Sequence, residues 1–262
     1  MAGRSNFVFK SNSLRKNIIG ISIFLIWVVI WECISIGVGQ ELMVPSPVSV
    51  IIRLYYLMGT VAFWQITATT VFRITIGFLI GCVLGVGLAV ITSVSSLLYA
   101  FFKPILNIIK ATPVASFIIL ALIWIRGGQI PAFISFLMVF PIIWANVSKG
   151  ISQTDRNILE MAKVYHLTRT QIVKKIFVHS VLPYFTAAAT ISMGLAWKAG
   201  IAAEVLSTPQ FAIGTSIYDS KIYLETVDLF AWSIVVIAMS VILERLIEFL
   251  IKRYLPSRDM EL

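Results

Sequence analysis

The chain has 262 residues, of which 59% are hydrophobic and only 13% are charged, and its mean hydropathy is +0.94. Soluble domains have roughly 45–50% apolar and about 25% charged residues, so this composition excludes an ordinary water-soluble fold and predicts that lipid surrounds much of the surface. The formal net charge of +9 does not require nucleic acid as a partner, because cytoplasmic loops of membrane proteins collect Lys and Arg.

The first apolar segment, 18–38, is long enough to cross a bilayer and too long for the apolar part of a typical cleaved signal peptide. It predicts a retained anchor, preceded by a cytoplasmic segment, 1–17. Residues 44–47 read Val-Pro-Ser-Pro and predict a turn. The residues after this turn, 48–58, place apolar side chains on one face and predict a short amphipathic helix at the membrane surface.

The second predicted span, 66–92, contains Gly77, Gly81 and Gly85 at intervals of four residues. This spacing places the three glycines on one helix face and predicts a seam where another helix packs closely. Arg73 lies near the outer end of the same span. An ionisable side chain inside a span is costly and often functional, so Arg73 either reaches the membrane surface or lies in a translocation path.

The third predicted span, 104–126, is ambiguous because its uninterrupted apolar part is too short to cross a bilayer of ~30 Å. Either the helix starts near Pro104 and carries Lys110 and Pro113, or the span is broken. The fourth predicted span, 130–147, contains Pro141, which predicts a kink.

Residues 148–180 form the only long polar interval and predict two short helices below the membrane, joined by a turn. Thr154 and Asp155 offer an N-cap for the first helix. The second is predicted to begin near Gln171 and to stop at Leu182-Pro183, where the fifth span begins.

The fifth predicted span, 183–203, carries Lys198, and Glu204 follows at its outer end. Six residues rotate a helix by about 240° net, so no direct pair between Lys198 and Glu204 is predicted. The functional interpretation is that Lys198 attracts an anion in the pathway and that Glu204 orders an outer gate or a receptor contact. The sixth predicted span, 229–251, completes a single membrane domain, 18–253, followed by a tail, 254–262.

Basic residues are concentrated in the first segment, after the second span, in residues 148–180 and in the tail. The positive-inside rule places these parts in the cytoplasm. Both termini are then cytoplasmic, which requires an even number of spans and supports six.

The polar interval resembles the cytoplasmic signature loop of the inner-membrane permease components of binding-protein-dependent ABC importers. That pattern is Glu-Ala-Ala, three residues, Gly, nine residues, Ile, one residue, Leu-Pro. Here Glu160, Met161 and Ala162 take the first three positions, and Ile176 takes the Ile position. His166 stands where the family has Gly, and residues 178–179 replace Leu-Pro, although Leu-Pro follows at 182–183.

Other segments are similar to the nitrate/sulfonate/taurine-type subfamily, in the same order along the chain, and the resemblance covers about 18–253. They are Val44-Pro45-Ser46-Pro47, Thr70 with Arg73, Gly77 and Phe78, and Ala196-Trp197-Lys198 through Ala203-Glu204 to Gly214.

The resemblance implies an all-α permease of the type I ABC importer kind, in a bacterial inner membrane, whose signature loop acts as a coupling helix. Two copies of a cytoplasmic ATPase, an extracytoplasmic solute-binding protein and a second permease copy are the implied partners. A small organic or inorganic anion of the nitrate, sulfonate or taurine type is the implied substrate. The residues assigned to ATPase coupling are Glu160, Met161, Ala162, Tyr165, His166 and Arg169.

The sequence lacks the Gly-x-x-x-x-Gly-Lys-Ser/Thr pattern that holds nucleotide phosphates, so ATP is expected to bind the partner subunit. His166 and His179 are the only histidines, and no cluster predicts catalysis, a metal site or a cofactor. Two alternatives stay open. One is the same class of importer for a vitamin precursor such as a hydroxymethylpyrimidine, and the other is a secondary transporter that works without an ATPase.

Overall fold

The computed structural model of the protein describes residues 5–254, which form helices and loops and contain no β-strand. The predicted tail, beyond residue 254, and residues 1–4 of the predicted N-terminal segment lie outside the described part. In chain order the elements are α1 (Ser5–Val38), α2 (Pro47–Met58), α3 (Val61–Val94), α4 (Ser96–Ala111), α5 (Val114–Trp124), η1 (Gly127–Gln129), α6 (Ile130–Ser152), α7 (Arg156–Val164), α8 (Arg169–Ile172), η2 (Val173–Phe177), α9 (Val178–Ser207), α10 (Ile213–Ile222) and α11 (Thr226–Tyr254).

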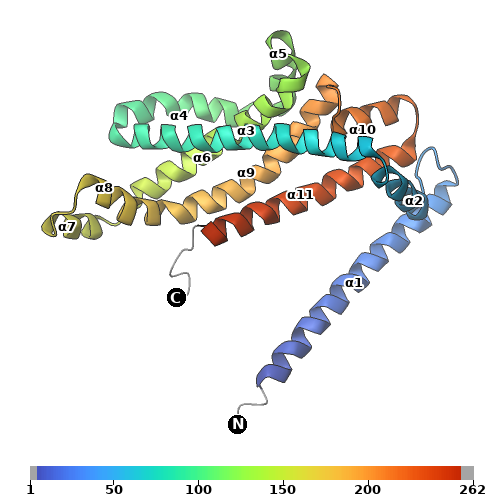
Figure 1. Ribbon diagram of the computed structural model, residues 1–262, viewed down its shortest axis with the longest axis horizontal. Helices are drawn as coiled ribbons and strands as arrows, with labels where there is room; N and C mark the ends of the chain where they lie inside the picture. The colour runs from blue at the N-terminus through green and yellow to red at the C-terminus, as the bar shows by residue number, and fades with distance from the viewer. Residues whose placement is uncertain (1–4, 255–262) are drawn as a thin grey trace.

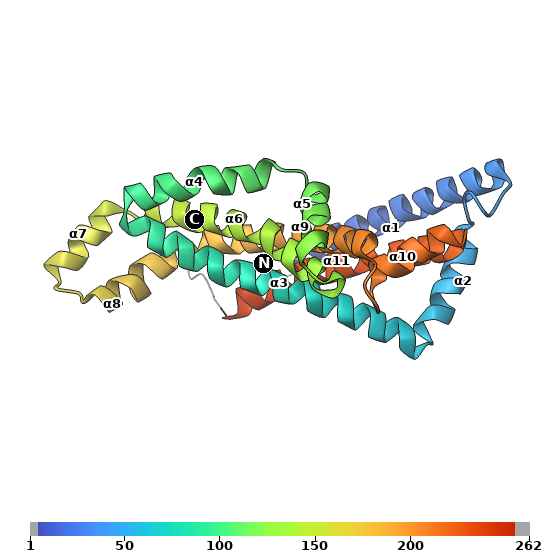
Figure 2. The ribbon, with the colours of Figure 1, turned by 90° about the horizontal axis from the view of Figure 1, so that it is seen from above.

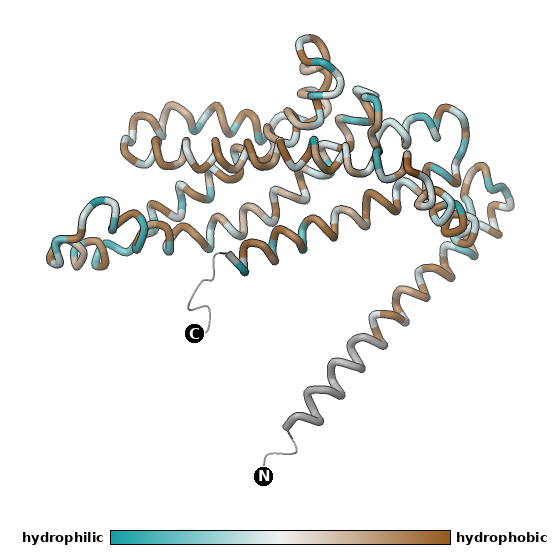
Figure 3. Tube along the Cα trace, in the orientation of Figure 1, coloured by the Kyte–Doolittle hydropathy of each residue, from teal (hydrophilic) through white to brown (hydrophobic). Residues whose placement is uncertain are grey.

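The all-α membrane architecture is confirmed. Within the described residues, four helical segments are long and apolar enough to cross a membrane, and α4 with α5 makes a fifth if this bent pair is one span. The sixth predicted span, 229–251, lies within α11, and the number of six stays a prediction. Figure 3 shows apolar residues along the long helices and polar ones around α7 and α8. The four segments are Ile19–Val38, Val61–Val94, Gly127–Ser152 and Arg169–Ser207.

The third span is broken, as one of the two alternatives for this region states. α4 begins at Ser96, earlier than predicted, and carries Pro104 inside it, while α5 starts only after Pro113. The axes of α4 and α5 differ by 101°. Thr112 has the extended conformation that a following proline favours, with φ −78° and ψ 133°. Thr112 and Pro113 therefore end α4 and turn the chain.

Helix α6 lies between α3 and α9 and forms the centre of the bundle (Figures 1 and 2). The glycines of α3 face α6 so closely that side chains would not fit. A Cβ atom at Gly77 would lie 2.1 Å from the backbone oxygen of Ala132, and one at Gly81 would lie 2.7 Å from Cβ of Val139. Gly85 meets Ile143 in the same way, so the three-glycine face is where α3 and α6 pack.

Helix α1 leans away from the other helices in Figure 1 and joins them at its far end. Trp31 donates a hydrogen bond from Nε1 to the oxygen of Pro45 (3.1 Å) and stacks on Phe230 of α11. Helix α2 is tied to α11 by a two-pronged ion pair between Arg53 and Asp228. The hydrogen bond to Asp228 is the main reason that the pKa of Arg53 is raised.

The predicted helix end at Leu182-Pro183, just before the fifth span, is wrong. The helical path does not stop at Leu182-Pro183 but runs through Pro183, as part of the continuous segment Arg169–Ser207. Proline removes one backbone hydrogen bond, and membrane helices tolerate it where neighbouring groups compensate. The π-helical turns of η2 come directly before α9 and connect it to α8.

Candidate functional site at the outer end of helix α9

Glu204 lies one turn before the end of α9, and its side chain is completely buried, with 0% exposure. The helix ends where Thr208 takes a left-handed conformation, with φ 40°, and donates its backbone N–H to the oxygen of Glu204 (2.8 Å). This end fixes the position of the carboxylate against its neighbours. A buried carboxylate in a mainly apolar bundle is costly unless polar partners surround it.

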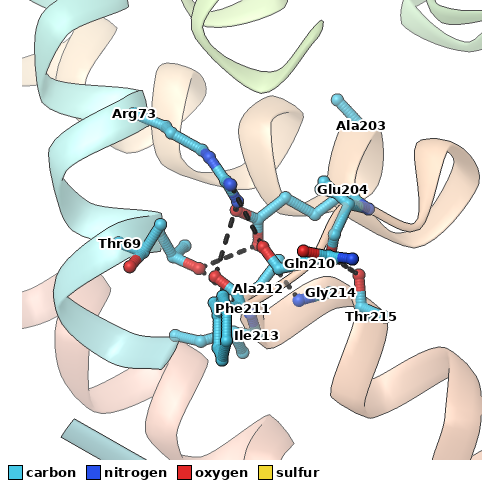
Figure 4. Close-up of polar contacts among 12 residues, drawn as sticks. Thr69, Arg73, Ala203, Glu204, Gln210, Phe211, Ala212, Ile213, Gly214 and Thr215 are labelled. Atoms are coloured by element: carbon cyan, nitrogen blue, oxygen red, sulfur yellow. Dashed lines mark hydrogen bonds and ion pairs between the residues drawn. The ribbon is translucent and has the colours of Figure 1, made fainter. Parts of the chain in front are cut away.

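Two donors hold one oxygen of this carboxylate. Thr70 of α3 donates from Oγ1 to Oε2 of Glu204 (3.0 Å), and the backbone N–H of Gly214 donates to the same oxygen (3.1 Å). Thr70 Oγ1 also accepts the N–H of Ile213 (3.0 Å). The hydroxyl therefore joins α3, the end of α9 and the start of α10 in one network. Figure 4 shows Glu204 of this network with Arg73, Ile213 and Gly214 around it.

Gly214 is the residue that lets α10 approach the carboxylate. A Cβ atom at this position would lie 2.4 Å from Cβ of Glu204 and 2.6 Å from the backbone nitrogen of Val205. Neither neighbour is the flexible end of a side chain, so a larger residue would separate α10 from α9.

Arg73 lies one turn beyond Thr70 on α3 and approaches the second carboxylate oxygen. Its Nη1 is 3.8 Å from Glu204 Oε1, and its side chain is 19% exposed. The guanidinium also donates to the backbone oxygens of Gln210 (3.1 Å) and Phe211 (3.4 Å). Within the described part of the chain, Glu204 Oε1 is buried without a hydrogen bond.

These contacts make a latch, which we define as Glu204, Thr70, Arg73 and Gly214. It closes the loop between α9 and α10, in which Phe211 has a positive φ of 52°. The sequence indicated Arg73 and Glu204 separately but missed their pairing. In the sequence, Thr70 and Gly214 stood out only as parts of segments that resemble the family. The spacing of three residues between Thr70 and Arg73 could have indicated that both lie on one helix face.

Lys198 does not belong to the latch. Its side chain is exposed on α9, whereas the adjacent Trp197 is buried and donates from Nε1 to the oxygen of Val236 in α11 (2.9 Å). Among residues 5–254 no hydrogen bond or ion pair reaches the ammonium group. Within the described residues, Lys198 is therefore an unpaired cation exposed on the surface of this single chain, on a largely apolar helix.

The predicted coupling residues lie at the other end of the bundle. Asp155 caps α7 by accepting the N–H of Asn157 (2.8 Å). At the other end of α7, His166 has φ 54°, and two backbone bonds close the helix, His166 N–H to Lys163 and Leu167 N–H to Ala162, each 3.0 Å. This is a Schellman end, in which glycine is usual at the left-handed position.

A second cap follows at once. Thr168 and Gln171 form a reciprocal capping box that starts α8. Ala162 is buried, while Glu160, Met161, Tyr165, His166 and Arg169 are exposed, with exposed fractions of 51% for Met161 and 73% for Tyr165. Helix α7 is thus fixed at both ends and presents apolar and charged side chains outward.

The comparisons with known proteins agree with this arrangement. Residues 77–256 match the family described as "Binding-protein-dependent transport system inner membrane component". The nitrate import permease protein NrtB of Leptolyngbya laminosa is 28% identical over 199 residues, covering 75% of this chain and 70% of that protein. A Bacillus subtilis protein named for the transport of aliphatic sulfonates, SsuC, is 22% identical over 235 residues, covering 88% and 84%.

The fold is similar to that of a chain in an inward-facing structure of the methionine ABC transporter MetNI. The TM-score is 0.55 at 22% identity, and the match covers 72% of this chain and 91% of that one. Together with the family match, this likeness confirms the resemblance that the signature loop indicates.

Proposed function

Because the chain belongs to the family of binding-protein-dependent transport system inner membrane components, we propose that it forms the translocation path of an ABC importer for small anions. The ATPase of such an importer is a separate subunit, and a solute-binding protein delivers the solute. The family match over residues 77–256 carries the proposal. An ATPase-independent secondary transporter is not favoured by it.

Helix α7 is the proposed contact with the ATPase. A helix can transmit a displacement only if its ends are fixed, and the Asp155 cap and the Schellman end at His166 supply this stiffness. Met161 and Tyr165 offer apolar contact area, and Glu160 and Arg169 offer charge-assisted hydrogen bonds to a partner. Two ATPases that close on ATP would draw two copies of α7 together and switch the access of the path.

Lys198 supports the choice of an anion. An unpaired ammonium group facing lipid at mid-span is strongly unfavourable, so its exposed position on a single chain is best explained by a water-filled path or a second permease copy. In a homodimer, two such residues would make the path positive. The names of the nitrate and sulfonate relatives point to the same class of solute.

The latch at Glu204 is the proposed outer gate. It lies at the end of the bundle opposite α7, and the positive-inside rule places α7 and both termini in the cytoplasm. The long contact of 3.8 Å between Arg73 and Glu204 Oε1 leaves that oxygen free of hydrogen bonds. Opening of the gate would break the hydrogen bonds of Arg73 to Gln210 and Phe211 in the loop 208–212, and those of Thr70 and Gly214 to Glu204.

The test is uptake into proteoliposomes that contain this chain and its ATPase, with the solute-binding protein outside. ATP-dependent uptake of nitrate, a sulfonate or taurine is expected, whereas uptake of only a pyrimidine vitamin precursor would select the alternative substrate. Glu160→Arg is expected to abolish co-purification of the ATPase and ATP-dependent uptake. Glu225→Arg, an exposed charge reversal at the far end of the bundle, is the control and is expected to retain co-purification of the ATPase. Full uptake without any ATPase would refute the function.

A further inference from the structure

A cavity of about 660 Å³ opens at the α7 end of the bundle, far from the latch. Its wall consists of the last turn of α3, the first turn of α4 and the last turns of α6. Figures 1 and 2 show the turn between α3 and α4 at the same end as α7. Neither the coupling residues nor the latch contribute to this wall, so the cavity is a separate feature.

Hydroxyl groups dominate the polar part of the wall. Ser148 Oγ is buried and has no hydrogen-bond partner, and the hydroxyls of Ser96 and Tyr99 make none either, within the part of the chain that the structure describes. Thr92 differs, because its Oγ1 donates to the oxygen of Leu88 (2.8 Å) and accepts from Trp144 Nε1 (3.0 Å). Ser96 and Tyr99 therefore offer exposed hydroxyls to a ligand, and the buried hydroxyl of Ser148 beside them is unpaired.

The charge around these hydroxyls is positive. Lys149 lines the cavity, and its ammonium group has no ion pair among the described residues, while no acidic residue lines the wall. The N-terminus of α4 opens here at Ser96, with no acidic residue in its first turn and no side-chain cap from Ser95. A helix N-terminus favours anions through its free N–H groups and its dipole.

A second lysine adds to this charge. The Nζ atom of Lys103 lies 5.8 Å from the centre of the Tyr99 ring, and this ring also stacks on that of Trp144. Tyr99 thus contacts both an ammonium group and an indole, while its hydroxyl has no hydrogen bond to any residue that the structure describes. The cavity therefore combines the groups that bind oxyanions in proteins, namely a cationic side chain, a helix N-terminus and hydroxyls without protein partners.

We propose that this cavity binds an oxyanion through Lys149, Ser148, Tyr99 and the N-terminus of α4. The ligand is either a free solute or the phosphate of an anionic lipid headgroup, since both carry the same oxygen acceptors. If the ligand is a solute, the cavity holds the transported anion after the anion has crossed the membrane, and this interpretation rests on the proposed function. The proposal that the cavity binds an oxyanion is independent of the proposed function.

The experiment uses the full chain in nanodiscs of phosphatidylcholine, with or without phosphatidylglycerol. Saturable binding of radiolabelled sulfate, competed by nitrate, is expected in phosphatidylcholine. Lys149→Gln should weaken it about tenfold or more, since a hydrogen bond to a charged group is lost. Lys174→Gln is the control, because Lys174 is an exposed lysine of η2 outside the cavity, and it should bind as the wild type does.

The lipid source is tested in the second set of nanodiscs. If phosphatidylglycerol abolishes sulfate binding, and native mass spectrometry shows that the wild type retains this lipid while Lys149→Gln loses it, the cavity binds the headgroup phosphate. Equal sulfate binding and equal lipid retention by the Lys149 and Lys174 variants would overturn the proposal. ATP-driven uptake separates this outcome from a failure of the proposed function. If the cavity binds nothing but uptake persists, only the cavity proposal fails. If the cavity binds sulfate but uptake is absent, only the proposed function fails.

Discussion

Replacing Thr70 by Val should destabilise the protein more than any other change of comparable size near the latch. The two side chains have nearly the same shape, so the substitution removes the hydroxyl and little volume. That hydroxyl donates to Glu204 Oε2 (3.0 Å) and accepts from the N–H of Ile213 (3.0 Å) in a fully buried position.

The expected magnitude follows from the two lost contacts. A hydrogen bond to a charged group contributes about 1.5–3 kcal/mol, and a buried N–H left without a partner costs about 1–3 kcal/mol. The two effects share one atom, so they are not fully additive, and we expect a loss of about 3 kcal/mol in the free energy of unfolding. Gly214 still donates to the carboxylate, which keeps the loss below that of removing Glu204 itself.

Unfolding of the purified protein by SDS in mixed micelles, followed by circular dichroism, measures this loss. Thr69→Val is the matched control, because Thr69 is only partly buried and its side chain bonds only to the oxygen of Gln65 in its own helix (2.7 Å). It should change stability by less than about 0.5 kcal/mol. Thr70→Ser retains the hydroxyl and should recover most of the loss. If the Thr69 and Thr70 valine variants unfold alike, the reasoning about the latch is wrong.

Two further predictions concern the loop and the glycine face. His166→Gly should stabilise the end of α7 by about 0.5–1 kcal/mol. The penalty of about 1–2 kcal/mol for a non-glycine residue in the left-handed conformation exceeds the added freedom of glycine in the unfolded chain. Slower amide hydrogen exchange in α7 would measure this stabilisation, and unchanged exchange would contradict the prediction. Gly81→Val should push α3 away from α6, because its Cβ atom would lie 2.7 Å from Cβ of Val139, and should lower the midpoint of unfolding. Gly87→Val is the control and should leave the midpoint unchanged, because the space around Gly87 is open. Equal midpoints for the two variants would contradict this prediction.

Local sequence signals predicted the features that depend on neighbouring residues. The four-residue spacing of Gly77, Gly81 and Gly85 identified one helix face, and Thr154-Asp155 identified the region where α7 begins. The family pattern left open whether His166, which replaces the usual Gly, keeps a left-handed turn, and the structure shows that it does. In each case the interactions span a few residues, so the pattern itself contains the physical information.

Features that depend on distant contacts could not be predicted in this way. The Thr70–Glu204 hydrogen bond joins residues 134 positions apart, and no periodicity brings them together. Pro183 shows the opposite failure, because its local preference predicted a helix end that the membrane bundle overrides. The break at Pro113 was one of two readings, since residues 104–126 fit a poor continuous span and a broken one equally well.

The continuous helical segment Arg169–Ser207 connects the two proposed functional ends of the molecule. Its first turn is part of the capping box beside α7, and its last turn carries Glu204, with Lys198 between them. We therefore expect a displacement of α7 to reach the latch along this segment, through the π-helical turns of η2. Such turns occur frequently at functional sites. An apolar contact at the latch would hold α3 and α10 as firmly as the buried carboxylate does, and often more firmly. A carboxylate that keeps one oxygen without a hydrogen bond is instead suited to a contact that must open, which accounts for its place at the far end of this helix.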